Sequence, residues 1–300
     1  MTQTIGRMTK GLKPLIDGDL LTYEVAFGVQ RKDEDGTPRI NSFDSCVDLF
    51  EQKVREILGE TEATEPPVFY LTLGKDLLKI INRNRKGRGE GPLEWKPNFR
   101  EAAATTAKYK GGRDSEKPFH YLNLMGHMMA NYETKIAVGM EADDLMSIDQ
   151  TNGGNGYETI ICSRDKDLRI TPGWHFGWVC GAQPQFGPQL IDELGFLELS
   201  GKGKLSGGGL KFFYAQLIMG DKVDNVPGIP GGGPALAHKT LSGCVNEEEL
   251  FQATASLYEK KIGENWREYF KEQATLLWMC RELDEHSNPI SYIMYDERSK

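Results

Sequence analysis

Three carboxylates crowd into four consecutive positions of the segment VGMEADDL, where Glu141, Asp143 and Asp144 directly follow the apolar run TKIAV. In a helix, Glu141 and Asp144 lie three residues apart on one face, with Asp143 close enough to join them. Such crowding is typical of a cation site. A structural explanation stays open, because the dipole of any helix favours acidic residues in its first turn.

Acidic residues also follow other apolar runs along the chain. Asp17 ends the run LKPLID, and Asp165 and Asp167 follow YETIIC in the segment SRDKDL. Two acidic segments behind apolar runs are much harder to attribute to helix capping alone. Clustered carboxylates repel one another, and a hard divalent cation such as Mg²⁺ or Mn²⁺ removes that repulsion.

The elements that must position these carboxylates alternate along the chain between strand and helix patterns. We predict strands over 12–17, 68–74, 134–138, 157–163 and 174–180, with helices over 20–29, 46–58, 119–132, 210–219 and two within 246–284. This alternation predicts an α/β fold with a mostly parallel central sheet flanked by helices. Sites in such sheets lie beyond the carboxyl ends of the strands, where we expect the acidic segments to meet.

Two stretches lack an apolar period. Residues 82–98 are rich in Gly, Pro and Arg and are expected to form an exposed, mobile insertion. Residues 181–189 and then 200–209 are expected to form a polar, glycine-rich connection. The surrounding segment 75–117 contains twelve Lys or Arg against six Asp or Glu. This local basic excess indicates either a nucleic-acid contact or a solvated loop.

Composition limits the remaining classes. The chain has 300 residues, 39% of them hydrophobic, which supports a sizeable core. No secretory or transmembrane segment is apparent, so a cytoplasmic protein without membrane contact is expected. Five cysteines without a CxxC pair argue against disulfides and zinc. The net charge of -8 argues against nucleic acid, but setting aside eight candidate metal ligands leaves 36 acidic against 36 basic residues.

The string GDKVDNVPGIPGGGPALAHKTL begins near residue 220 and is the most specific in the chain. Asp221 and Asp224 are three apart and could face the same crevice from a helix. The glycines of PGIPGGG allow backbone amides to approach phosphate closely, although a plain glycine-rich turn stays open. Neither a Walker A motif nor a dinucleotide-binding motif fits, because no strand leads into the glycines and no GK[ST] follows.

Together these blocks resemble the phage 5'-to-3' exonucleases and flap endonucleases, a PIN-like family that includes the 5'-nuclease domain of bacterial DNA polymerase I. LIDGDLL, EADDL, SRDKDL and GDKVDNVPGIPGGG match in order, and YKGGR at 109–113 resembles the arch motif of the family. The resemblance covers roughly residues 12–242. It implies a nuclease core over 1–208 with a helical arch insertion at about 75–117. The helical region 209–300 would carry a DNA-binding helix-three-turn-helix at 217–242.

The resemblance also implies roles for individual residues. The metal ligands would be Asp17, Glu141, Asp143, Asp144, Asp165, Asp167, Asp221 and Asp224, with Asp143 and Asp144 also counted as catalytic. Lys110 and Arg113 would position the scissile phosphate. Gly228, Gly231 and Gly233 would contact duplex phosphates. Members of the family often bind a potassium ion at these turns. Two or more Mg²⁺ ions, or Mn²⁺, would support hydrolysis of DNA, or of RNA in RNA–DNA hybrids.

The implied enzyme is a 5'-3' exodeoxyribonuclease or flap endonuclease that acts as a monomer on duplex DNA with a 5' end or flap. Its task would be phage DNA replication or degradation of host DNA, in the host cytoplasm if a phage encodes it. The chain departs from the family at two places: Ala235 stands where many relatives have Lys, and Leu73 where many have a metal-site aspartate. We expect Asp76 to serve its own helix start, and the site to hold its metals more loosely.

Two other classes stay open. In a haloacid-dehalogenase-like phosphatase, Asp17 would be a covalent nucleophile and Asp19 its acid-base partner. That class needs a strand before GDKVDN, where the spacing is helical, and leaves EADD and DKD without a role. A catalytically inactive DNA-binding module is the other alternative, and metal-dependent release of nucleotides from DNA would eliminate it.

Overall fold

The computed structural model describes residues 11–112, 116–153 and 158–298, so Arg113 lies outside the described part. The chain forms two compact units that interleave in sequence. Unit 1 comprises Met1–Pro97, Ser115–Arg164 and Trp174–Gln189, and unit 2 comprises Asn98–Asp114, Asp165–Gly173 and Leu190–Lys300. The domain boundary expected at residue 208 stays a proposal.

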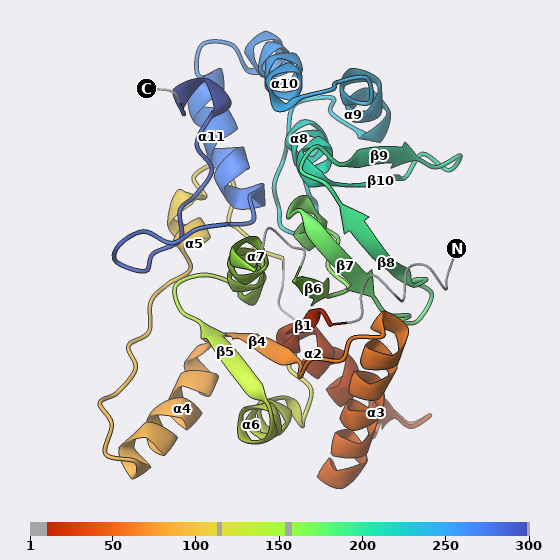
Figure 1. The fold of residues 1–300 in the computed structure, drawn as a ribbon, viewed down its shortest axis with the longest axis vertical. Helices are drawn as coiled ribbons and strands as arrows, with labels where there is room; N and C mark the ends of the chain where they lie inside the picture. The colour runs from red at the N-terminus through yellow and green to blue at the C-terminus, as the bar shows by residue number, and fades with distance from the viewer. Residues whose placement is uncertain (1–10, 113–115, 154–157, 299–300) are drawn as a thin grey trace. The chain divides into compact units, whose positions relative to one another are not determined.

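Unit 1 is built around a six-stranded sheet (Figure 1). In sheet order its strands are β5 (Glu133–Ala137), β4 (Val68–Thr72), β1 (Lys13–Asp17), β6 (Thr159–Cys162), β7 (Gly173–Gly177) and β8 (Phe186–Ile191), of which the ends of β7 and β8 belong to unit 2. The pairings β5–β4, β4–β1, β1–β6 and β6–β7 are all parallel. The prediction of a mostly parallel sheet is confirmed.

Helices cover the sheet because alternate strand residues are apolar on both sides. Ile16, Phe69 and Cys162 join the core formed with α2 (Gly18–Gly28), α3 (Phe43–Thr61) and α6 (Tyr121–Asn131). The other alternate residues of these strands, such as Leu15 and Tyr70, are also buried but lie outside that core. Helix α7 (Ala142–Asn152) packs against β1, β4, β5 and β6. A small hairpin, β2 (Gln30–Lys32) and β3 (Pro38–Ile40), completes unit 1 with α4 (Lys75–Gly87).

Two expectations for connecting segments are wrong in part. Helix α4 extends to Gly87, so only the later part of 82–98 lacks regular structure. Of the expected connection, 181–189 contains most of β8 and 200–209 contains β10 (Leu205–Gly208). Strand β9 (Phe196–Leu199) lies between the two segments and forms an antiparallel hairpin with β10. Glycine-rich composition masked these strands, because short strands of this kind give no clear apolar alternation.

Unit 2 is organised around α8 (Gly209–Met219), which is buried on nearly every side. Packed against it are α9 (Pro234–Leu241), α10 (Glu247–Ile262), α11 (Trp266–Leu277) and the short 3₁₀ helix Asp167–Ile170. Helix α5 (Phe99–Ala103) packs against α11, and the 3₁₀ helix Tyr295–Glu297 packs against α10. Arg100 is fully buried, and its guanidinium donates to the carbonyls of Leu276 and Trp278. One of the twelve basic residues of 75–117 is thus structural. In the described residues, no helix is both long and apolar enough to cross a membrane.

Candidate metal centre and phosphate-binding turns

The first candidate ligand lies where β1 passes into α2. Asp17 is buried, and its Oδ1 accepts a hydrogen bond from the Leu20 amide at 2.9 Å. Its Oδ2 accepts one from the Ser163 hydroxyl, beyond the end of β6, at 2.7 Å. A Cβ at Gly18 would lie only 2.7 Å from the Tyr70 carbonyl oxygen, so glycine is needed for the chain to pass this close to β4.

The cluster EADDL lies at the start of α7, as the spacing predicted. Glu141 is the N-cap residue, and the buried Asp144 accepts a hydrogen bond from the Glu141 amide at 3.2 Å in a reciprocal capping box. The Ala142 amide donates to Thr72 Oγ1 at 2.9 Å, which ties this helix to the carboxyl end of β4. Helix capping therefore accounts for Glu141 and Asp144, which is the structural explanation that the sequence left open for the acidic cluster. Asp143 is only half-buried and lies in the same first turn.

Sequence reasoning counted Asp19 only in the phosphatase alternative, yet it belongs to this end of the sheet. Its Oδ2 accepts a hydrogen bond from the Thr72 amide at 2.9 Å, while its Oδ1 is buried without a partner. Burial above all raises the pKa of Asp19 to about 7, and the nearby charges of Asp17 and Glu141 add to the rise against the opposing Thr72 hydrogen bonds. The segment DGD itself was the signal available in the sequence.

Unit 2 carries the second set of carboxylates, and one lysine joins two of them. Lys166 Nζ lies 2.7 Å from Asp167 Oδ1 and 2.5 Å from Asp221 Oδ2. Gln216 of α8 donates to the same Asp167 oxygen at 2.6 Å, and Asp165 Oδ1 accepts from the Asp167 amide at 2.9 Å. These contacts bring three of the four predicted unit 2 ligands into one hydrogen-bonded group.

The pKa values of the two carboxylates that contact Lys166 shift in opposite directions. Burial and then the charge of Asp165 raise the pKa of Asp167 to about 6, although Lys166 opposes the rise. Burial acts in the same direction on Asp221, but its hydrogen bond and ion pair with Lys166 bring its pKa below the usual range. Burial lowers the pKa of Lys166, and the two carboxylates outweigh that effect and raise it.

Asp221 and Asp224 do not lie on a helix, which corrects the expectation from their spacing. They belong to a turn closed by paired backbone hydrogen bonds between Asp221 and Val226, both 2.8 Å long. Asp221 Oδ1 accepts from the Val223 amide at 2.7 Å and fixes the turn. Short polar side chains that bond the backbone two residues on favour such turns over helix, and this local competition decides the structure here.

Lys110 is fastened to this turn. The Lys110 amide donates to the Asp224 carbonyl at 3.1 Å, and the Tyr109 hydroxyl to Asp224 Oδ2 at 3.3 Å. Asn225 donates to the Lys108 carbonyl at 2.9 Å. Lys110 itself has a φ of 51°, a conformation that non-glycine residues seldom adopt. The YKGG segment is therefore tied closely to the second carboxylate set, within unit 2.

The glycine turns after α8 divide by role. Gly228 is buried, its amide donates to Gln273 Oε1 at 3.1 Å, and its carbonyl accepts from Tyr269. Because the Gly228 amide already donates to Gln273, it cannot also donate to a phosphate in this arrangement. Gly228 therefore has a structural role in the turn. Gly231 is exposed with a φ of 73°, and Gly233 is the N-cap residue of α9. Ala235 is exposed near the same helix start.

The donors suit a hard divalent cation, since both sets are carboxylates and a buried oxygen of Asp19 is orphaned. Within the described ranges, no three Asp, Glu, His or Cys side chains converge as the ligands of a single ion. The carboxylates instead accept hydrogen bonds from nearby amides, hydroxyls and Lys166. Binding a cation would require side-chain rotations away from these partners.

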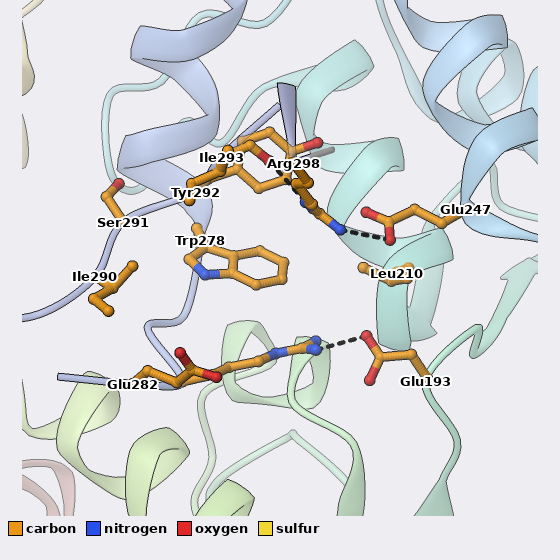
Figure 2. A pocket seen from close by; sticks show the side chains of 11 residues that line it. Glu193, Leu210, Glu247, Trp278, Glu282, Ile290, Ser291, Tyr292, Ile293 and Arg298 are labelled. Atoms are coloured by element: carbon orange, nitrogen blue, oxygen red, sulfur yellow. Dashed lines mark hydrogen bonds and ion pairs between the residues drawn. The ribbon is translucent and has the colours of Figure 1, made fainter. Parts of the chain in front are cut away.

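A separate pocket of about 260 Å³ lies in unit 2 and contains none of the predicted site residues (Figure 2). Its two arginines are paired, Arg281 with Glu193 at 2.6 Å and Arg298 with Glu247 at 2.8 Å. Arg281 also stacks over Trp278, with its guanidinium carbon 4.5 Å from the ring centroid. Both arginines are thus paired with glutamates of the same pocket, which indicates that they stabilise the packing of the C-terminal segment.

No protein-family model matches the chain. DNA polymerase I of Bacillus subtilis (strain 168) is 27% identical over 210 residues, covering 60% of this chain and 20% of that protein. DNA polymerase I of Rhizobium leguminosarum is 30% identical over 127 residues, covering 41% of this chain and 11% of that protein. The chain therefore spans only about a fifth of the length of the first polymerase, and less of the second.

Among solved structures, the T5 D15 protein co-crystallised with metal ions matches with a TM-score of 0.53 and 13% identity, covering 88% of each chain. The fold is similar to that of T5 D15. The predicted α/β fold with a mostly parallel central sheet flanked by helices is thereby confirmed. The phosphatase alternative loses its structural basis, because the helix α8, and not a strand, leads directly into Gly220 and Asp221.

Proposed function

We propose that the chain is a metal-dependent 5'-to-3' nuclease that hydrolyses DNA phosphodiesters, with exonuclease or flap-endonuclease action. The observation that carries this proposal is the acidic edge of unit 1, where Asp17, Asp19 and the EADD cluster gather at the carboxyl ends of parallel strands. Its fold is similar to that of a protein crystallised with metal ions. Matches to two DNA polymerases support DNA as the substrate.

The proposed ligands are Asp17, Glu141, Asp143 and Asp144 in unit 1 and Asp165, Asp167, Asp221 and Asp224 in unit 2. Divalent cations, Mg²⁺ or Mn²⁺, would ionise the attacking water and stabilise the departing 3' oxygen, so that no covalent intermediate is needed. The chain's own contribution is to hold the carboxylates. Ser163 and the Leu20 amide fix Asp17, and the capping box fixes Asp144.

Lys110 is proposed to bind the scissile phosphate, since it is fastened to the turn that holds Asp221 and Asp224. Arg113 is proposed for the same role on the motif alone. The exposed Gly231 and the α9 start at Gly233 are proposed to contact duplex phosphates without reading sequence, with a potassium ion at the same turns. The proposed substrate is a duplex with a 5' end or flap, cut by a monomer during phage replication or host DNA degradation.

The decisive experiment incubates a 5'-labelled flap duplex, a blunt duplex and a single strand with Mg²⁺ and sizes the products. We expect cleavage from the 5' side that excess chelator abolishes, and a turnover reduced by at least about two orders of magnitude in Asp143→Asn, because that carboxylate would hold a cation in the transition state. DNA binding by Asp143→Asn should persist.

The matched control is Glu133→Gln, which neutralises an exposed carboxylate paired with Lys13 at the start of β5. It should cleave like the unmodified chain. Cleavage that continues in excess chelator would contradict the metal-dependent mechanism. Binding without any release of nucleotides would identify an inactive DNA-binding module, and hydrolysis of a small phosphomonoester alone would restore the phosphatase alternative.

A further inference from the structure

Asp19, in the first turn of α2 at the acidic edge of unit 1, has only one of its two carboxylate oxygens hydrogen-bonded. One oxygen accepts the Thr72 amide at 2.9 Å, and the other, Oδ1, is buried without a partner. No Lys or Arg of the described residues forms an ion pair with it. A buried acceptor that lacks a partner costs free energy in a folded protein, and this holds more strongly if the group is charged.

Two further acidic groups lie near Asp19. The charges of Asp17 and Glu141 both act on its carboxylate, so three acidic groups share this small region. Thr72 links them, since its amide donates to Asp19 and its hydroxyl accepts from the Ala142 amide beside Glu141. Leu73, the next residue, is buried in the apolar core and supplies no carboxylate at the end of β4.

Gly18, the first residue of α2, lets the chain pass close to β4, because a Cβ at this position would collide with the Tyr70 carbonyl oxygen and the Leu71 side chain. This close approach brings Asp19 of α2 against Thr72, the last residue of β4, the strand next to β1. The Asp19 carboxylate, in the first turn of α2, thus lies at the carboxyl end of β4, where Leu73 supplies no carboxylate.

We propose that Asp19 is a direct ligand of a divalent cation held with Asp17 and Glu141, and that it supplies the carboxylate that Leu73 does not. This proposal rests on the proposed function for the presence of a cation, but its claim concerns Asp19 alone. The cation would use the orphaned Oδ1, while Oδ2 keeps its bond to the Thr72 amide. Asp17 and Glu141 would rotate away from their present hydrogen bonds to join it, because the three side chains do not converge on one point as they stand. Asp19 would then replace the negative charge that is missing at Leu73. The metals would not be bound more weakly, in contrast to the expectation from the sequence.

The test measures cation binding itself. Mn²⁺ affinity is determined by titration calorimetry and by electron paramagnetic resonance of free Mn²⁺, for the unmodified chain and for Asp19→Asn. Asparagine has the same shape and can still accept from the Thr72 amide, but it lacks the charge. We expect Mn²⁺ to bind about tenfold or more weakly to the variant, and its Mn²⁺-induced rise in Tm to shrink.

Asp76→Asn is the matched control, because Asp76 also lies in the first turn of a helix but pairs with Lys79 at 3.0 Å on the surface. It should bind Mn²⁺ like the unmodified chain. Asp19→Glu, which restores the charge, should recover part of the affinity. The rise in Tm is measured within each variant, so that a change in basal stability does not obscure the result.

The measurements distinguish a failure of the Asp19 assignment from a failure of the proposed function. If the unmodified chain cleaves DNA with Mg²⁺ but Asp19→Asn binds Mn²⁺ with unchanged affinity, the role of Asp19 is structural and only this proposal is overturned. If the unmodified chain binds no divalent cation and cleaves no DNA, the proposed function falls as well. Weakened binding in Asp76→Asn equal to that in Asp19→Asn would also overturn the assignment, since it would reflect net charge alone.

Discussion

At the scale of single residues, Lys166 is the internal counterion of the unit 2 carboxylates. Its ammonium contacts both Asp167 and Asp221, which would otherwise face each other as like charges in a largely buried place. The side chain is 43% exposed, so water screens part of these interactions. A divalent cation bound by the same two carboxylates would compete with Lys166 for them.

We therefore predict that Lys166→Gln lowers the stability of the metal-free protein by about 1 kcal/mol, a fall in Tm of about 2–4 °C. Saturating Mg²⁺ should remove most of the difference, because the cation then neutralises the carboxylates. The measurement is thermal unfolding with chelator and with Mg²⁺. Lys79→Gln, which breaks a surface pair with Asp76, should have little effect in either condition. An equal deficit with and without Mg²⁺ would argue against a shared cation site.

The sequence predicted most candidate ligands but not their local geometry. The positions of Asp17 and the EADD cluster at strand ends could be predicted, because strands and helices that pack in a buried sheet have a clear hydrophobic periodicity. Asp19 was not predicted as a ligand, because the pattern cannot say whether a first-turn aspartate faces solvent or the neighbouring strand. Asp221 and Asp224 were placed on a helix by their spacing, whereas backbone hydrogen bonds to the Asp221 side chain select a turn.

At the scale of elements, the long periodic segments were predicted and the short glycine-rich ones were not. The hairpin of β9 and β10 shows the reason. A Cβ at Gly207 would lie 2.5 Å from the Phe196 carbonyl, so glycine is required by close packing within the strand pair. Composition alone indicates a loose connection there, because a glycine that permits close approach looks the same in sequence as one that permits flexibility.

The glycine turns before α9 are predicted to contact the phosphates of duplex DNA. Gly231 is exposed, and a Cβ there would meet only Lys261 Nζ at 3.9 Å, so a side chain has room. Gly231→Asp should weaken binding to duplex DNA about tenfold by adding negative charge where phosphate approaches, and should spare single-strand binding. Fluorescence anisotropy with both substrates measures this.

Two controls separate charge from backbone strain. Gly231→Asn tolerates the positive φ and adds no charge, so it should bind duplex nearly normally. Gly243→Asp adds the same charge at an exposed glycine beyond α9. If Gly231→Asn binds as poorly as Gly231→Asp, the loss comes from the altered turn, and the phosphate contact is not supported.

At the scale of the whole molecule, the net charge of -8 opposes binding to a polyanion. The acidic sets of both units contribute much of this charge, and Lys166 neutralises only part of one set. Some basic residues are also unavailable, such as Arg100, which is buried among backbone carbonyls. Cations bound at the carboxylates would therefore serve DNA binding as well as hydrolysis.

This charge balance predicts that cations bound at the carboxylates strengthen the binding of DNA. In Ca²⁺, whose flexible oxygen coordination suits it poorly to a fixed reaction geometry, the chain should bind flap duplex about tenfold or more tightly than in excess chelator. Anisotropy titrations at constant ionic strength measure the difference, because added salt by itself weakens binding. In Asp143→Asn/Asp165→Asn, which removes one predicted ligand from each unit, the gain from Ca²⁺ should shrink while binding in chelator improves. A gain from Ca²⁺ that is the same in this variant would place the cation on the DNA and not on the carboxylates.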